Sequence, residues 1–299
     1  DQLLGSRSDE VSFTEFIPKA GLNYKLTPYI SVYTSYGLSS DIPGTNELDN
    51  PPILDPNDPF IGKPLNHRLE PSKSQNFELG IKGNVIRPQA RFLKKLLFET
   101  TFFNYAIDND IIPFEILTEV YFQNTGRTHR RGLEIGADMN VLKGLNLNFA
   151  YTYSDFQFDD YIAQKFEISG STFEIDQERD FSGNFVPSIP EHNLSVSFSY
   201  AHKLAKNLTG FSKVSDWITS GMYVDDANSE QTDGYQVVDF TLGLDVTINR
   251  FNLILSGGVR NVFDETYVAF INTNSADRRF YEAGAPRNYF GNIKFGYTL

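Results

Sequence analysis

The 299-residue sequence contains no cysteine. This absence excludes a disulfide scaffold, a thiolate zinc site and a cysteine nucleophile. Basic residues are fewer than acidic ones, 26 against 38, and the net charge of −12 argues against a general nucleic-acid-binding protein. No stretch approaches about 18 consecutive apolar residues, so the sequence predicts no transmembrane helix. This absence does not exclude a membrane β-barrel, because the apolar residues of a barrel occupy alternate positions and its average hydropathy is low.

Aromatic residues, in contrast, are abundant at 14%, too many for a disordered chain. The length alone would suggest two soluble domains of about 150 residues each. The sequence pattern points elsewhere, because apolar and polar residues alternate with a period of two along most of the chain. The clearest case has apolar residues at every even position: Val238, Phe240, Leu242, Leu244, Val246 and Ile248.

Successive side chains of a strand point to opposite faces, so each alternating segment has one apolar and one polar face. A helix would scatter the same residues around its circumference. The pattern therefore predicts β-structure, and 207–221 alternates least regularly. Eleven strands are expected, at about residues 13–25, 28–38, 73–86, 95–114, 121–142, 145–159, 189–203, 207–221, 234–248, 251–262 and 287–299.

Most of these segments exceed the roughly 5–6 residues usual in globular strands and reach the about 9–11 needed to cross a bilayer. Their connections alternate between short and long. Tight turns at 26–28, 143–144, 204–206 and 249–250, with a slightly longer one at 87–94, alternate with long stretches at 39–72, 160–188, 222–233 and 263–286 and a short one near 115–120. Short turns on one rim and long loops on the other are typical of outer-membrane barrels. A soluble β-sandwich is the alternative, since its strands also alternate.

The acidity is concentrated in the expected long loops. Windows 39–72, 155–188, 222–235 and 263–287 hold 22 acidic and 7 basic residues, a net charge of −15, so the remainder carries +3. Such a rim could concentrate cations or cationic ligands, or bind divalent ions that bridge lipid headgroups. The alternative is that exposed loops simply need solvation.

Four segments resemble the C-terminal barrel region of TonB-dependent outer-membrane receptors, and a proline-rich strand entry, P-S-I-P-E-H-N at 187–193, fits the same family. Their order and spacing carry the resemblance, which covers nearly the whole chain from Phe13. The segments are F-I-P-K-A-G-L-N-Y-K-L-T-P at 16–28, L-E-P-S-K-S-Q-N-F-E-L-G-I-K at 69–82, N-T-G-R-T-H-R-R-G-L-E-I-G at 124–136, and R-N-V-F-D-E-T-Y at 260–267, continuing through G-A-P-R-N at 284–288.

The resemblance implies an all-β, antiparallel transmembrane β-barrel of about 22 strands with a plugged lumen. The eleven expected strands would then form its C-terminal half, with residues 1–299 as a single barrel region. No segment resembles the plug domain, and half a barrel has two unpaired edges, so we expect a fragment of a longer chain. The final strand is similar to the C-terminal strand recognised by the outer-membrane assembly machinery, although Leu299 replaces the family's usual terminal Phe or Trp.

The family further implies a receptor in the bacterial outer membrane that takes up a ferric siderophore or similar iron chelate. Its partners would be that chelate, outer-membrane lipid and, through an N-terminal region, the TonB complex that supplies the energy. No nucleic acid, cofactor or enzymatic activity is expected. Alternatives are a passive or adhesive barrel, transport of another substrate such as cobalamin or an oligosaccharide, and a soluble β-sandwich binding module.

Residues for chemistry are few. The four histidines lack metal-site spacing, and His192 beside Glu191 is expected to begin a strand rather than form a catalytic dyad. Asp55, Asn57 and Asp58 resemble calcium ligands, but Pro56 and Pro59 and the missing remainder of an EF-hand loop argue against a site. No metal or catalytic site is therefore predicted.

One basic and aromatic cluster stands out in the acidic loops. Arginines in it could bind an anionic iron chelate through paired hydrogen bonds. Alternatively, they pair with lumen carboxylates such as Glu134 and Asp138. The candidate ligand-binding residues are Arg278, Arg279, Tyr281 and Arg287.

Overall fold

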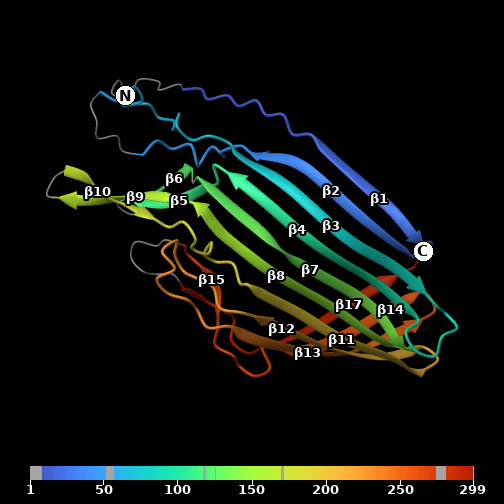
Figure 1. Ribbon diagram of the computed structural model, residues 1–299. Helices are drawn as coiled ribbons and strands as arrows, with labels where there is room; N and C mark the ends of the chain where they lie inside the picture. Colours follow the sequence, from blue (N-terminus) through green and yellow to red (C-terminus); the bar gives the residue numbers. More distant parts are fainter. Residues whose placement is uncertain are drawn as a thin grey trace.

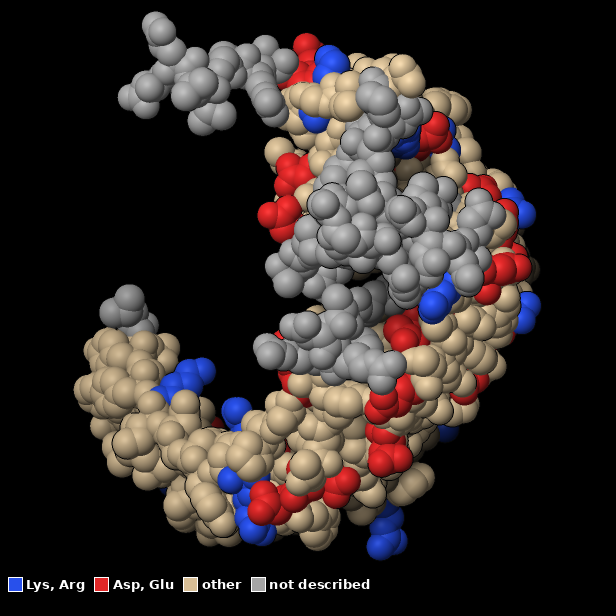
Figure 2. Space-filling model, turned by 90° about the vertical axis from the view of Figure 1, so that its left-hand side faces the viewer, with Lys and Arg blue, Asp and Glu red and all other residues tan. Residues whose placement is uncertain are grey.

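The computed structural model describes residues 9–51, 57–116, 119–124, 126–169, 172–273 and 281–298. All regular structure in these residues is β-strand, and eleven strands form one antiparallel sheet (Figure 1). No helix in this part of the chain is long and apolar enough to cross a membrane. The sheet curves into an arc whose edge strands, the first and the last, are not paired with each other (Figure 2).

We call this sheet the wall. Its strands have 9 to 16 residues, as expected for strands that cross a bilayer obliquely. In sheet order they are β1 (Lys19–Thr27), β2 (Ile30–Asp41), β3 (Ser72–Ile86), β4 (Lys95–Asp108), β7 (Arg127–Leu142), β8 (Leu145–Asp160), β11 (His192–Ala205), β12 (Leu208–Thr219), β13 (Tyr235–Ile248), β14 (Phe251–Arg260) and β17 (Asn288–Tyr297).

The connections sort onto two ends of the wall, as predicted. The turn end carries the connections 28–29, 87–94, 143–144, 206–207 and 249–250, and the loop end carries all the longer ones. Backbone geometry explains one tight turn: Gly144 has φ +82°, and a Cβ there would lie 2.1 Å from the Ala201 carbonyl oxygen. Only glycine satisfies both conditions.

The two faces of the wall differ as the alternation predicts. On the concave face, Tyr33 of β2 reaches across Gly80 of β3 to Thr101 of β4, with their hydroxyl oxygens 2.7 Å apart. A Cβ on Gly80 would lie 2.4 Å from the Tyr33 ring, so glycine allows this contact. The convex face carries the apolar rows, among them Leu242 and Leu244, which are exposed. No second sheet packs on this face within the described residues, so the β-sandwich alternative is wrong.

Three further hairpins extend from the loop end, and the sequence analysis missed them as separate elements. Expected strand 95–114 ends at Asp108 and is followed by β5 (Ile111–Ile116), while β6 (Glu119–Asn124) precedes β7 within expected strand 121–142. The expected loop 160–188 contains β9 (Ile162–Ser169) and β10 (Thr172–Asp180). Segment 263–286 contains β15 (Val268–Ile271) and β16 (Tyr281–Ala283).

The first expected strand also begins later, at Lys19 rather than 13. The remaining wall strands agree with their predicted ranges to within about three residues, and β11 begins at His192. The least regular expected strand, 207–221, is β12, where Gly210 and Ser212 interrupt the apolar row. Both residues face outward, opposite His202 and Tyr200 of β11.

The molecule's buried core lies at the loop end. Met222, Val224 and Ile271 form a buried apolar cluster, against which Val268 packs. The largest fully buried side chain is Phe158, at the end of β8. The wall contributes to the buried residues at the loop ends of its strands, through Phe103 and Ile107 of β4, Phe158 of β8 and Tyr235 of β13, whereas its long apolar rows point outward.

Candidate functional site

The loop end is the candidate functional site, and a buried tyrosine organises its centre. The Tyr161 ring lies 4.8 Å from that of Phe158 and 5.3 Å from that of Phe181, measured between centroids. Its hydroxyl donates to Asp226 Oδ2 at 3.1 Å and lies 3.4 Å from Gln123 Nε2. Burial, together with the nearby Asp226 carboxylate, raises the pKa of Tyr161 well above its usual range. Tyr161 therefore stays protonated and joins β6 to the loop after β12.

Two long loops are also joined through amide side chains. Asn228 Oδ1 accepts from the Phe185 backbone N–H at 2.7 Å, and its Nδ2 donates to the Phe185 carbonyl at 2.8 Å. Asn184 Nδ2 donates to the Asp226 carbonyl at 2.8 Å. The Phe185 and Tyr223 rings stack with centroids 5.6 Å apart. Segments 181–191 and 220–234 consequently form one folded surface rather than two independent loops.

Tyr281, one of the predicted ligand residues, lies on this surface. It is the first residue of β16, and its hydroxyl donates to the Glu230 carboxylate. That hydrogen bond is the main reason that the pKa of Tyr281 rises to about 12. At neutral pH the phenol is therefore protonated, and its face stays partly exposed.

Arg287 has a different environment. Its backbone N–H donates to Asp264 Oδ1 at 2.8 Å, and its guanidinium lies 3.3 Å from both Asp264 Oδ2 and the Val262 carbonyl oxygen. The alternative that Arg287 pairs with Glu134 or Asp138 is wrong, because its partner is this loop carboxylate. Arg287 thus fixes the entry into β17, while Arg278 and Arg279 lie outside the described residues.

The other predicted features have ordinary surroundings. His192 Nδ1 lies 2.9 Å from the Tyr151 hydroxyl, and the two rings stack. Asp58 pairs with Arg68, and this hydrogen bond lowers the pKa of the Asp58 carboxyl. Asp55 is outside the described residues. Within the described ranges, no group of three or more His, Asp or Glu side chains is arranged to hold a metal ion.

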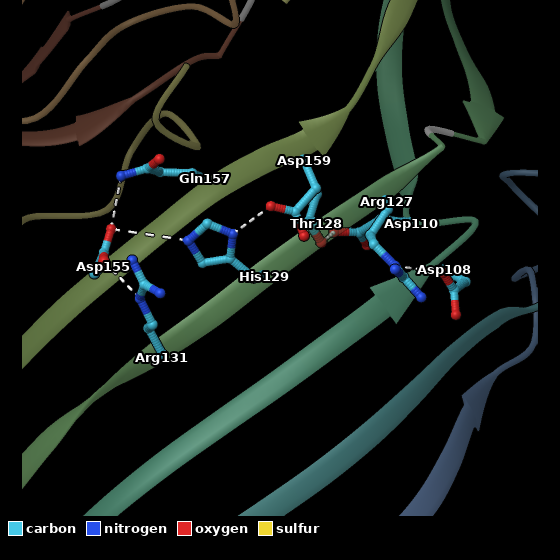
Figure 3. A network of polar contacts seen from close by, with 9 residues as sticks. All are labelled: Asp108, Asp110, Arg127, Thr128, His129, Arg131, Asp155, Gln157 and Asp159. Atoms are coloured by element: carbon cyan, nitrogen blue, oxygen red, sulfur yellow. Dashed lines mark hydrogen bonds and ion pairs between the residues drawn. The ribbon is translucent and has the colours of Figure 1, made fainter. Parts of the chain in front are cut away.

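A polar network at the loop ends of β4, β7 and β8 escaped the sequence analysis (Figure 3). Arg127 Nε donates to Asp108 at 2.9 Å, and Arg131 Nε donates to Asp155 at 2.7 Å. Both pairs are directly opposite in the register, the positions at which opposite charges on neighbouring strands interact. His129 lies beside this second pair, with Nδ1 2.6 Å from Asp159.

The alternation divides this basic segment between two faces. Arg127, His129 and Arg131 share the outward parity of Leu133, whereas Thr128 and Arg130 share the inward parity of Glu134. The two inward residues both bind Asp110, Thr128 through its hydroxyl at 3.1 Å. Segment 124–136, which resembles the receptor family, thus has two roles. Its inward residues hold Asp110 at the start of the β5–β6 hairpin, and its outward arginines pair with Asp108 and Asp155.

Deeper on the concave face lies a hollow of about 360 Å³. Tyr33 donates to Glu99 at 2.9 Å, and Tyr105 donates to Glu78 at 2.6 Å. Glu134 also lines the hollow. Within the described part of the chain, none of these three glutamates forms an ion pair with a basic side chain. The inner wall is therefore polar and carries negative charge.

The loop end is acidic as a surface. Figure 2 views it directly and shows acidic side chains along much of this face of the arc. Several carboxylates have partners, as Asp264 does, but the excess of acidic residues predicted for the long connections remains. A curved wall with alternating faces, short turns at one end and long loops at the other is the architecture of the outer-membrane barrel class.

Comparisons with known proteins specify the family. Residues 3–262 match the model of the family described as "TonB dependent receptor-like, beta-barrel". The catecholate siderophore receptor Fiu of Escherichia coli K12 is 27% identical over 272 residues, 91% of this chain and 31% of Fiu. The probable TonB-dependent siderophore receptor PiuA of Acinetobacter baumannii is 24% identical over 252 residues, 83% of this chain and 30% of PiuA.

A solved structure agrees on the fold. BauA, the ferric preacinetobactin receptor from Acinetobacter baumannii, superposes with a TM-score of 0.63 at 18% identity, covering 94% of this chain and 36% of BauA. The chain belongs to the TonB-dependent receptor family. It spans about 30% of the length of the curated relatives that it matches. The expected fold class is confirmed: an all-β, antiparallel, eleven-stranded part of a barrel.

Proposed function

We propose that the full-length protein is an outer-membrane receptor that takes up a ferric siderophore. The match of residues 3–262 to the receptor barrel family carries this proposal. Curated relatives named as siderophore receptors support the substrate class. The loop end supports it too, since hydrogen bonds join its long loops into one surface, and a preorganised surface costs less ordering when a ligand binds. The relatives are receptors and transporters, so an enzymatic activity has no support among them.

We also propose that transport depends on TonB and on a plug domain inside the barrel. Support comes from the concave face, where Glu78, Glu99 and Glu134 surround a polar hollow without basic partners in the described chain. Glu99 and Glu134 are exposed in this chain, and a domain that covered them inside the lumen would have to supply such partners. Reading the complete gene tests this part, because the proposal requires a plug-like α+β segment before residue 1, and its absence would contradict the proposal.

The ligand residues stay a proposal of the same kind. Arg278, Arg279 and Tyr281 are proposed to contact the chelate, while Arg287 positions the loop through Asp264. In the full-length receptor, replacing Arg278 and Arg279 together by glutamine should weaken chelate binding by about tenfold or more, because each removes a hydrogen bond to a charged group. The matched control, Arg87→Gln plus Arg91→Gln at the turn end, should leave chelate binding unchanged.

Growth of a deletion strain tests the function itself. With catecholate, hydroxamate or citrate chelates as the only iron source, the strain should lose growth and iron-55 uptake on one of them, and the intact gene should restore both. Normal growth and uptake on all iron chelates would contradict the proposal. A defect confined to cobalamin or an oligosaccharide would assign the receptor to that substrate instead.

A further inference from the structure

A groove of about 870 Å³ crosses the convex face of the wall towards its turn end. The strand register shows that two adjacent rows of outward side chains form it. The row farther from the turns is Tyr200, Ser212, Leu242, Gly257 and Gly291. The row nearer the turns is His202, Gly210, Leu244, Leu255 and Ile293.

Side-chain size explains why these rows form a groove rather than a flat surface. Gly210, Ser212, Gly257 and Gly291 leave a low floor between larger neighbours. A Cβ on Gly291 would have no atom within 4 Å, so the floor is open there. The groove is almost wholly apolar, and its volume is within the roughly 300–1,000 Å³ of ligand sites in proteins.

Three turns follow one another along the turn end beside this groove, and each carries a basic residue. Backbone hydrogen bonds fix two of these turns to the next strand: Ala201 N–H of β11 donates to the Gly144 carbonyl at 2.8 Å, and Thr247 N–H of β13 donates to the Asn207 carbonyl at 3.0 Å. The basic residues are Lys143, Lys206 and Arg250.

All three basic side chains are exposed, and none forms an ion pair with an acidic residue of the described chain. Lys206 follows His202 and Leu204 of the groove by four and two residues. The Gly144 turn, next to Lys143, lies against Tyr200 and Ala201. An apolar groove therefore ends at a rim of unpaired positive charge.

We propose that this groove binds the acyl chain of an anionic phospholipid whose headgroup phosphate is held by Lys143 and Lys206, while Arg250 on the next turn adds to the attraction. The inference rests on the proposed outer-membrane location, in which short turns face the periplasm and the lipid leaflet there is phospholipid. Charge complementarity favours this occupant, because basic residues near a membrane surface attract anionic headgroups. A second copy of the chain would have to cover the positive rim with itself, which like charge opposes.

The test uses the full-length receptor, delipidated in detergent and titrated with lipid in native mass spectrometry. The two probes are phosphatidylglycerol and phosphatidylcholine with identical dioleoyl chains. For the first lipid bound, we expect about tenfold tighter binding of phosphatidylglycerol, since each basic residue near a headgroup contributes to the attraction. Heat-modifiable migration in gels confirms that every variant is folded.

Two variants separate the headgroup contribution from that of the chain. The triple variant Lys143→Gln, Lys206→Gln, Arg250→Gln should bring phosphatidylglycerol binding to within about twofold of phosphatidylcholine, whose own binding falls less because its choline cation offsets the phosphate charge. Gly291→Phe should weaken both lipids by about tenfold and keep their ratio, because it fills the floor of the groove. The matched control, Lys25→Gln, Arg87→Gln, Arg91→Gln, removes the same charge from the end of β1 and from the 87–94 turn and should behave as wild type.

Three results would overturn the inference: equal affinity of the wild type for the two lipids, an equal loss of selectivity in the control variant, and dimerisation through the groove without bound lipid. The outcome is separable from that of the proposed function. Absent lipid selectivity in a receptor that takes up a ferric siderophore defeats only this inference. Retained selectivity without such uptake defeats only the proposed substrate.

Discussion

Apolar side chains point away from the protein in the wall and towards one another at the loop end. On the wall, Leu242 is 58% exposed and Ile293 is 75% exposed. At the loop end, Val224 is 0% exposed and Ile271 is 1% exposed, and both belong to one buried cluster. The two regions belong to one chain but differ in what covers their apolar surface.

This difference indicates that the two regions face different solvents, hydrocarbon around the wall and water around the loop end. A wall whose apolar rows have no protein partner is stable only when hydrocarbon covers them, whereas the loop end builds its own core as a water-soluble domain does. Mutations in the two regions should therefore act separately. Substitutions at the loop end should change the local stability of the loops without unfolding the wall strands. Substitutions on the convex face should impair membrane assembly without changing the contacts between the loops.

The largest difference between the stability loss at the loop end and that in the wall is expected for Phe158→Ala in the full-length receptor. Phe158 is fully buried beside Tyr161, and removing a buried phenylalanine side chain costs about 3–5 kcal/mol. Hydrogen exchange should show that much loss of local stability in segments 181–191 and 220–234, with the wall strands unchanged. The exposed Phe92, replaced by alanine, serves as the control with no such loss. Equal deprotection of wall and loop end would show that the two regions unfold together.

The next effect is expected on the wall. An arginine in place of outward-facing Leu242 should cost about 2–4 kcal/mol of folding stability in liposomes, the cost of a charge on the lipid face of a barrel. Thr241→Arg is the matched control, since its neighbouring position faces the concave side. Urea titrations of the two variants measure the difference. A similar loss in both would mean that the faces are not distinguished by lipid.

A smaller effect should follow loss of one hydroxyl at the loop end. Tyr161→Phe removes the hydrogen bond to the Asp226 carboxylate, which is worth about 1.5–3 kcal/mol for a charged acceptor. Exchange rates in segment 220–234 report it. Tyr121→Phe, which removes a hydroxyl bonded to exposed Glu119, should cost below about 1 kcal/mol. The reverse order would show that Tyr161 does not organise the loops.

The smallest effect is expected where wall and loop end meet. A double-mutant cycle with Arg131→Gln and Asp155→Asn should give a coupling energy of about 0.2–1 kcal/mol, because Arg131 is half exposed and its pair is screened by water. Raising the salt concentration should reduce this coupling. A coupling above about 3 kcal/mol would place the pair in a dry environment and would move the lipid boundary towards the loops.

Most of the wall was predictable because its two solvents impose a period of two on each strand. The Arg131–Asp155 pair was not predictable from the turn alone. The tight turn at 143–144 pairs Leu142 with Leu145, and that register by itself would place Arg131 opposite Phe156. An irregularity between Asn140 and Leu142 shifts the register by one residue and brings Arg131 opposite Asp155.

The loop-end contacts follow no such rule. Tyr161 and Asp226, or Tyr281 and Glu230, come from loops far apart in the sequence, and no register relates them. The β9–β10 hairpin was read as a loop for a similar reason, since its charged sequence lacks the regular apolar row that marks the wall strands. That a single barrel region comprises residues 1–299 stays a prediction.

Site-directed spin labelling along β13 tests the two-solvent account most directly. The chain has no cysteine, so each introduced cysteine in it is unique. In liposomes, labels at positions 240, 242 and 244 should be accessible to oxygen and shielded from a water-soluble nickel chelate, with the opposite at 239, 241 and 243. Equal accessibility at even and odd positions would contradict the account.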